Sequence, residues 1–262
     1  MLKYWKIWEP HRKKVIEIIS NSKIKNDKTI AFFGAGFCND IDISFFQKNY
    51  SNVTLIDQYG IALEKGIKNQ GIDKNSIELK ELNFFEVNKS LISEFNIALK
   101  SKKKTEELIE ILLLLRESIE LNPLVKYLKY DYTVSIAVHS QLCNDLLIPL
   151  TTYKVNYSNE EIKKIKKMLE TVYYKYITLY NKLLIESSKR GTYIILDSKM
   201  LLNKCNKTNL EKFSHSIFGY GLCQQNIHNI TTIRNYKLNK NTWIWKYSDY
   251  RDYEVNSFFI EK

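Results

Sequence analysis

The sequence predicts an α/β protein built on a mostly parallel sheet. Short runs of β-branched and aromatic residues alternate with longer amphipathic stretches, which is the pattern of repeated strand–helix units. The first strand-like run enters a turn that contains Gly34 and Gly36. Two strand-like runs near the end of the chain, 231–236 and 253–260, have no helical pattern between them. We expect these two runs to pair antiparallel.

Composition limits the classes of protein to which the chain can belong. Its 262 residues, 44% of them hydrophobic, are enough to bury a sizeable core. No run of about 18 uncharged apolar residues occurs, and the first residues lack the apolar run of a signal peptide. We therefore expect a soluble, cytoplasmic protein without a membrane partner. The cysteines form no Cys-x-x-Cys pair, which favours reduced thiols over a disulfide framework or a zinc site.

The formal net charge of +11 permits a nucleic-acid partner. The basic residues are spread along the chain, however, and are not gathered with aromatic side chains. The densest runs, 102–104 and 163–167, have the patterns of a helix start or loop and of a solvated helix face. Nucleic acid is therefore a permitted partner that the sequence does not favour. The histidines are scattered, and no spacing of His, Asp and Glu indicates a metal site.

The first part of the chain predicts strands separated by helices. In chain order we expect a helix over 4–22, a strand over 29–33, a helix with the apolar face Ile41, Phe45 and Phe46, a strand over 53–56, a helix over 61–70 and a strand over 76–82. Asn39 or Asp40 is the expected cap of the helix that follows the first strand. Gly71 is the expected end of the helix before the third strand.

The second part begins with a helical stretch over 87–128, which we interpret as an insertion. Its leucine-rich block is too short for a membrane span and is expected to be a buried helix. In chain order there follow a strand over 132–138, a helix over 159–187, a strand over 192–196 ending at Asp197, a short strand edge around Trp243 and Trp245, and the final strand. No repeat or linker appears, so one domain over 1–262 is expected. Its predicted sections are a helical lid over 1–27, a cofactor-binding half over 28–86, the insertion and a substrate-side half over 129–262.

The turn after the first strand has the outline of a nucleotide-cofactor site. Gly34 lets the chain turn sharply off the strand, and Gly36 lets a ligand approach the backbone closely. The next strand ends on Asp57, about 20 residues further on, where an acid can hydrogen-bond a ribose diol. An ordinary loop acid is the alternative interpretation of Asp57. The pattern predicts an enzyme that binds a nucleotide cofactor.

The order of elements resembles the class I S-adenosylmethionine-dependent methyltransferases over most of residues 28–260. Residues 32–40, Phe-Phe-Gly-Ala-Gly-Phe-Cys-Asn-Asp, stand where that family has its glycine-rich loop, although Cys38 replaces the usual third glycine. The resemblance implies a Rossmann-like sheet of seven mostly parallel strands with helices on both faces and a C-terminal antiparallel hairpin. It also implies methyl transfer from S-adenosyl-L-methionine to a small-molecule or peptide acceptor. The cofactor-binding residues that it implies are Gly34, Ala35, Gly36, Asp57, Gln58, Asn83, Phe84, Ser140 and Gln141.

Other functions are less well matched. A nicotinamide-binding loop would need glycine at position 39, where Asn39 stands, and no second glycine loop follows the strand over 192–196. The terminal hairpin is also foreign to a dinucleotide-binding fold. An NAD(P)-dependent oxidoreductase, an RNA methyltransferase and a catalytically inactive cofactor-binding scaffold remain as alternatives.

Candidate catalytic residues follow the fourth predicted strand and lie in the N-terminal helix. His139 comes just after a buried strand, where open α/β sheets place their active sites, so it is a candidate base or orienting donor. A hydrogen-bonded structural histidine is the alternative. Tyr4 and His11 would face the site if the first helix is a lid, and aromatic rings there would favour a sulfonium. The alternative is that Trp5 and Trp8 are simply its buried face.

Overall fold

The computed structural model describes residues 2–20, 28–206 and 209–262. The strands of its large sheet are β1 (Thr29–Phe33), β2 (Asn52–Asp57), β3 (Glu78–Glu81), β6 (Tyr130–Ile136), β7 (Ser188–Asn206), β8 (Asn209–Ser216), β9 (Lys237–Ser248) and β10 (Arg251–Glu261). A separate small sheet pairs β4 (Phe85–Glu86) with β5 (Glu120–Leu121). The α-helices are α1 (Leu2–Ile7), α2 (Glu9–Ser20), α3 (Ile43–Asn49), α4 (Gly60–Asn69), α5 (Lys89–Lys100), α6 (Thr105–Ser118), α7 (Asn144–Tyr153), α8 (Asn159–Ser187) and α9 (Tyr220–Ile233). Short 3-10 turns are η1 (Lys74–Ser76), η2 (Pro123–Tyr127), η3 (His139–Gln141) and η4 (Lys154–Asn156).

The large sheet has the predicted mostly parallel arrangement. Its strand order in the described chain is β3-β2-β1-β6-β7-β10-β9, with β8 paired to β7 off this path. The strands from β3 to β7 are parallel, whereas β10 runs antiparallel to β7 and β9 antiparallel to β10. This is the Rossmann-like sheet with a reversed C-terminal hairpin that the methyltransferase resemblance implied. The prediction is confirmed, and β8 is an addition to it.

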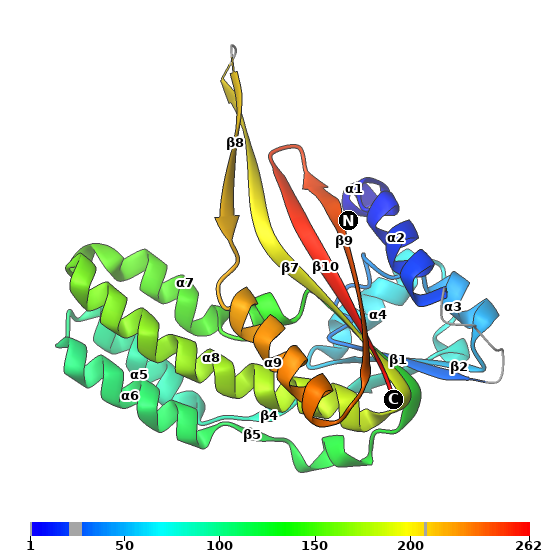
Figure 1. Cartoon of the computed structure of the whole chain (residues 1–262), viewed down its shortest axis with the longest axis horizontal. Helices are drawn as coiled ribbons and strands as arrows, with labels where there is room; N and C mark the ends of the chain where they lie inside the picture. Colours follow the sequence, from blue (N-terminus) through cyan, green and yellow to red (C-terminus); the bar gives the residue numbers. More distant parts are fainter. Residues whose placement is uncertain (1, 21–27, 207–208) are drawn as a thin grey trace.

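Helices cover both faces of the sheet. Successive residues of each strand point to opposite sides, so each strand contributes side chains to two cores. Ile30 and Phe32 of β1 belong to a core completed by α2, α3 and α4. Ala31 and Phe33 belong to the opposite core, which α5 to α9 complete. Figure 1 shows the two helical groups on either side of the strands, with the β7–β8 pair projecting away from both.

The helical insertion packs into the second of these cores. Leu108, Leu112 and Leu115 of α6 are buried, and α6 contacts both α5 and the long α8. The start of α8 is fixed by a capping box, in which Ser158 and Glu161 satisfy each other's backbone N–H groups. The insertion is therefore built into the body of the protein on the face opposite α2, α3 and α4.

The C-terminal hairpin differs from the prediction in its first strand. Residues 231–233 end helix α9 and are not a strand, and β9 begins only at Lys237. The β-branched run favoured a strand locally, but the Thr231 hydroxyl donates to the main-chain oxygens of Ile227 and His228 within the helix. Ile227 lies fully in the core. Tertiary packing thus overrides the local preference.

Three element boundaries also differ from prediction. The cap of α3 is Asp42, whose carboxylate accepts from the N–H of Phe45, and not Asn39 or Asp40. Strand β7 continues well past Asp197, because β8 and β10 pair with its second half. The N-terminal helix divides into α1 and α2. Pro10 lies in the first turn of α2, where a backbone N–H has no intrahelical partner, so its missing N–H costs no hydrogen bond. Its predicted end, 21–22, lies outside the described residues.

The described residues contain no helix long and apolar enough to cross a bilayer. Within the same part of the chain, no group of three or more His, Cys, Asp or Glu side chains has the arrangement needed to hold a metal ion. Cys38, Cys143 and Cys223 are buried free thiols.

Leu112→Ala should destabilise the protein by about 2–5 kcal/mol, because it opens a cavity in the core between α6 and α8. Leu112 is 0% exposed, whereas Leu114 on the same helix is 54% exposed. Leu114→Ala is therefore the matched control and should change the free energy of unfolding by no more than about 0.5 kcal/mol. Urea denaturation measures both, and equal losses would contradict the packing of the insertion described above.

Candidate active site at the carboxyl ends of the parallel strands

A crevice is expected where the chain reverses its direction of travel across the sheet. From β1 the chain builds β2 and β3 on one side and then returns to add β6 on the other side. Open α/β sheets bind their ligands outside the carboxyl ends of the strands at such a switch point. Phe33 of β1 pairs with Ile56 of β2 and with Ser135 of β6, so these strand ends lie level with one another.

The glycine turn lies at this point and needs both of its glycines. Gly34 and Gly36 have φ angles of +73° and +50°, which favour glycine strongly. A Cβ atom on Gly34 would collide with Val138, which follows β6, whereas no described atom lies within 4 Å of a Cβ built on Gly36. Gly34 therefore lets two loops meet, and Gly36 borders open space that a ligand can fill. Cys38 also has a positive φ, of 54°, at the position where a third glycine is usual.

Asp57 at the end of β2 is tied to this turn. Its Oδ2 accepts a hydrogen bond from the N–H of Gly36 at 2.9 Å, and its Oδ1 accepts from the N–H of Tyr59 at 3.0 Å. The side chain is buried. A carboxylate has about four acceptor positions, so these two bonds leave positions for a ligand's hydroxyl groups. Gln58, beside it, is exposed.

The predicted adenine-side residues lie beyond β3. Asn83 is exposed, and its side-chain oxygen accepts from the N–H of Phe85 at 3.3 Å, as in a turn. Phe84 is buried among rings, with its centroid 5.6 Å from that of Phe33 and 5.5 Å from that of Tyr180. These contacts account for a structural role of both residues, and their contact with a cofactor stays a prediction.

The loop after β6 places Ser140 next to an acid from β7. The Ser140 hydroxyl lies 3.2 Å from Oδ2 of Asp197 and 3.1 Å from the main-chain oxygen of Ala137. Gln141 is exposed, and its side-chain amide donates to the same Ala137 oxygen at 3.1 Å. Ser140, after β6, thus reaches Asp197 within β7.

His139 is buried and held in one tautomer by a chain of amides. Its Nε2 lies 2.8 Å from Oδ1 of Asn181, whose own amide nitrogen donates to Asn226. Asn226 in turn donates to Thr178. Because Oδ1 of Asn181 accepts, Nε2 of His139 carries the proton and Nδ1 keeps a lone pair, for which the described residues supply no partner. Burial lowers the pKa of His139 to about 4, so the ring is uncharged at neutral pH. Its predicted catalytic role is untested.

The N-terminal helices pack on the C-terminal hairpin. The His11 ring stacks on Trp245 with centroids 4.1 Å apart, and its Nδ1 accepts from the indole N–H of Trp243 at 3.2 Å. Burial lowers the pKa of His11 to about 3. Tyr4 is largely exposed and lies beside Trp8, with ring centroids 5.5 Å apart. His11 is thus fully packed in this arrangement, and Tyr4 has a free edge.

The same helices also reach the loop that follows the glycine turn. The Arg12 guanidinium donates to the main-chain oxygen of Asn39 at 2.8 Å and to that of Trp5, and it lies 3.5 Å from the centroid of the Trp5 ring. Helix α2 is therefore anchored to residues next to the candidate site. A lid function for 1–27 stays a prediction.

Two further acids, Asp197 and Asp40, belong to the candidate site. The sequence predicted only that Asp197 ends a strand and that Asp40 could cap a helix. Burial raises the pKa of Asp197 to about 6, although the hydrogen bond from Ser140 acts to lower it. Burial likewise raises the pKa of Asp40 to about 7; the charge of Asp197 adds to this shift, and the charge of Arg12 opposes it. The sequence signal for Asp197 was its position just after a buried parallel strand.

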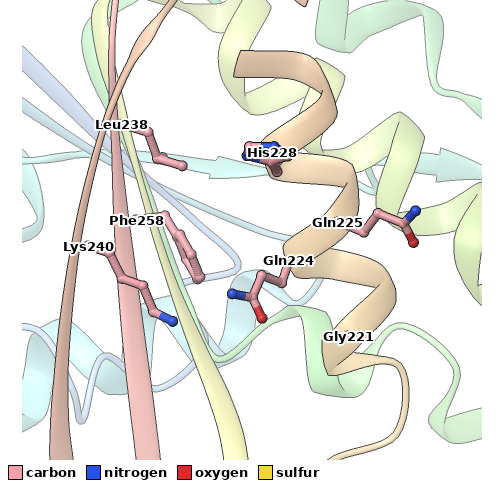
Figure 2. A pocket seen from close by; sticks show the side chains of 7 residues that line it. All are labelled: Gly221, Gln224, Gln225, His228, Leu238, Lys240 and Phe258. Atoms are coloured by element: carbon pink, nitrogen blue, oxygen red, sulfur yellow. The ribbon is translucent and has the colours of Figure 1, made fainter. Parts of the chain in front are cut away.

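A second hollow lies elsewhere, between α9 and the hairpin. Its volume is about 360 Å³, and it is lined by Gly221, Gln224, Gln225, His228, Leu238, Lys240 and Phe258. Figure 2 shows Leu238, Phe258, Lys240 and Gln224 bordering the space between the helix and the strands, while Gln225 points away. Phe258 pairs with Ile194 in the first half of β7. None of the residues named above for the candidate site lines this hollow.

Comparison with known proteins gives distant likenesses. No family model matches the chain, and no curated protein matches it. A similar solved structure is an S-adenosylmethionine-dependent methyltransferase from Clostridium acetobutylicum, with a TM-score of 0.45 and 9% identity over 97% of this chain and 91% of that one. Another, from Aquifex aeolicus, has a TM-score of 0.41 and 10% identity over 99% and 97%. Magnesium protoporphyrin IX methyltransferase from Synechocystis, solved with bound S-adenosylmethionine, has a TM-score of 0.38 and 11% identity over 96% and 80%. These values describe a likeness in chain arrangement and assign no activity to this chain.

Asp197→Asn should stabilise the protein more at pH 7.5 than at pH 4.5. The folded state raises the pKa of Asp197 to about 6, so it holds the proton more tightly than the unfolded chain, where the pKa is near 4. The stability that this group contributes is present below about pH 4 and is lost as the pH rises through 6. Urea denaturation of both proteins at each pH measures the difference between them.

Asp131→Asn is the control for this pH response. Although burial opposes it, hydrogen bonds from the backbone and hydroxyl of Thr29 lower the pKa of Asp131. Asp131 is therefore largely ionised in both states at both pH values, and its variant should differ from the parent protein by similar amounts at each. The same flat response for Asp197→Asn would contradict a raised pKa at that position.

Proposed function

We propose that the chain is an S-adenosylmethionine-dependent methyltransferase that acts on a small-molecule or peptide acceptor. The observation that carries the proposal is the junction of Asp57 with the glycine turn. The carboxylate, fixed by the N–H groups of Gly36 and Tyr59, lies at the switch point of the sheet beside the open space over Gly36. An adenosine group fits this junction, with its ribose diol on the free positions of Asp57 and its chain passing over Gly36.

The remaining residues fit the chemistry of direct displacement. The bound cofactor supplies an electrophilic methyl group on a sulfonium, so the protein has to align the acceptor, exclude water and take a proton where the acceptor has one to lose. His139 offers an unprotonated Nδ1 at neutral pH, and Ser140 and Asp197 offer polar groups at the next strand ends. The low pKa of His139 suits it to accepting a hydrogen bond more than to holding a proton.

The direction of the strands in the sheet favours S-adenosylmethionine over a nicotinamide nucleotide as the cofactor. A dinucleotide-binding fold repeats its parallel nucleotide-binding half, whereas here the strands beyond β7 are the antiparallel β10 and β9. The formal charge of +11 keeps RNA as an acceptor to be tested.

Calorimetric titration tests the assignment directly. The purified protein is titrated with S-adenosylmethionine, S-adenosylhomocysteine, NAD and NADP at two salt concentrations. Micromolar binding of the first pair alone is expected. Binding of a nicotinamide nucleotide, or of none of the four, would overturn the proposal. An RNA oligonucleotide whose affinity falls steeply with salt would move the acceptor class to RNA.

Asp57→Asn should weaken S-adenosylhomocysteine binding while the fold persists. The change removes a charge-assisted hydrogen bond worth about 1.5–3 kcal/mol, which is roughly a tenfold to hundredfold loss of affinity. Glu64→Gln, at an exposed surface ion pair with Lys74, is the control and should bind normally. Circular dichroism verifies the fold of both variants. Unchanged affinity in Asp57→Asn would remove Asp57 from the site.

Gly36→Ala should abolish tight binding of S-adenosylhomocysteine, and Gly71→Ala should not. Both glycines have positive φ angles, of 50° and 67°, and neither has a described atom within 4 Å of a built Cβ. The two variants should therefore lose similar stability, about 1–2 kcal/mol each. A methyl group on Gly36 alone enters the space assigned to the ligand, which should cost roughly tenfold in affinity or more. Equal affinities by calorimetry would show that no ligand passes over Gly36.

A further inference from the structure

We propose that the methyl acceptor is an amine, and that its nitrogen binds at Asp197, three strands along the sheet from Asp57, with Asp40 as the second carboxylate. This inference rests on the proposed function and names the acceptor class of the same site.

The order of the strands gives the order of the ligand's parts. Asp57 ends β2, the glycine turn ends β1, Ser140 follows β6 and Asp197 lies on β7, and these strands are neighbours in that order. Neighbouring strands are about 4.8 Å apart, so the row from Asp57 to Asp197 spans roughly 14 Å. A nucleoside held at Asp57 directs the rest of the cofactor across β1 and β6. The acceptor then enters from the β7 end, where Asp197 lies.

The Asp197 carboxylate has a bonding position that no protein group fills. Its Oδ2 takes the hydrogen bond from Ser140. Its Oδ1 is buried, and the described residues offer it no hydrogen-bond partner. Buried polar atoms in native proteins almost always have a partner, so an unpaired one indicates a bound group or water. Because Oδ1 is closed to solvent here, a donor binds it only after the groups that cover it have moved.

The charge balance at this end of the crevice favours a cation. The charge of Asp197 adds to the effect of burial in raising the pKa of Asp40. Arg12 is the positive group near Asp40, but its guanidinium donates to the main-chain oxygens of Asn39 and Trp5. Its charge lowers the pKa of Asp40 and so offsets part of the negative charge here, while these two hydrogen bonds go to uncharged groups. A ligand ammonium would relieve the repulsion between two carboxylates that a hydroxyl or thiol would leave in place.

An amine acceptor also suits these groups as proton acceptors. The ammonium form gives one proton to a carboxylate, which becomes a carboxylic acid. The freed nitrogen lone pair forms the bond to the methyl carbon while the carbon–sulfur bond breaks, and its electron pair neutralises the sulfonium as a thioether. The product nitrogen carries the positive charge, which the second carboxylate stabilises. Two carboxyls with raised pKa values are able to exchange that proton near neutral pH.

The test compares a cation with its neutral counterpart on the same complex. Protein saturated with S-adenosylhomocysteine is titrated with benzylamine and, separately, with benzyl alcohol by calorimetry. We expect benzylamine to bind more tightly than the alcohol in the parent protein. Asp197→Asn should reduce benzylamine affinity by about tenfold to a hundredfold, as expected for a charge-assisted hydrogen bond, and leave the alcohol unaffected. Asp40→Asn should act in the same direction, and it replaces Asp197→Asn if that variant unfolds. Glu64→Gln is the control and should bind both probes as the parent protein does.

Each other outcome overturns the inference in a distinct way. Equal affinities for the amine and the alcohol, or no measurable amine binding, would remove the amine preference. Loss of S-adenosylhomocysteine affinity in Asp197→Asn would assign the carboxylate to the cofactor's own ammonium group. Loss of S-adenosylmethionine affinity alone would assign it to the sulfonium. In these last two cases the proposed function survives, whereas a parent protein that binds neither cofactor form would defeat the proposed function itself.

Discussion

The candidate site depends on the hydrogen bond from the N–H of Gly36 to the carboxylate of Asp57. A turn with left-handed residues directs backbone N–H groups away from the sheet ladder, and each must find an acceptor. The first two N–H groups of the turn, on Gly34 and Ala35, bond to the main-chain oxygen of Ile56, and the third reaches Asp57. The end of β2 therefore holds the whole turn in place. The same carboxylate that shapes the turn also faces the space that the turn leaves open.

The reversed hairpin has a structural consequence beyond the sheet. Because β9 and β10 extend the sheet past β7, they supply an aromatic surface on which Trp8, in the turn between α1 and α2, and His11 of α2 pack. Helix α2 in turn contacts the loop after the glycine turn through Arg12. One end of the chain is thus linked to the other and to the candidate site. A change in the packing of α2 would alter the position of Asn39, which lies close to the glycines, without any movement of the sheet itself.

How well the sequence predicted each element depends on the range of the interactions that stabilise it. Strands β1 and β2, the glycine turn and helix α8 were predicted because hydrophobic periodicity and glycine positions are local signals. Residues 231–233 were not, because burial of Ile227 and its helix outweighed a β-branched run. The effect of the Asp197 charge on Asp40 was equally out of reach. These residues are far apart in sequence, and only the order of the strands in the sheet brings them together.

The distribution of charge separates the crevice from the rest of the molecule. The chain has a formal charge of +11, yet the side chains gathered at the strand ends include Asp57, Asp197 and Asp40, with Arg12 turned toward main-chain oxygens. A phosphate backbone entering this crevice would meet carboxylates and lose free energy to repulsion. A nucleic acid bound by the basic surface would therefore have to keep its phosphates outside and insert only an uncharged group. A small cationic acceptor meets no such obstacle, because the general positive charge slows its approach only modestly at physiological salt, where the Debye length is about 8 Å, while the carboxylates attract it at contact.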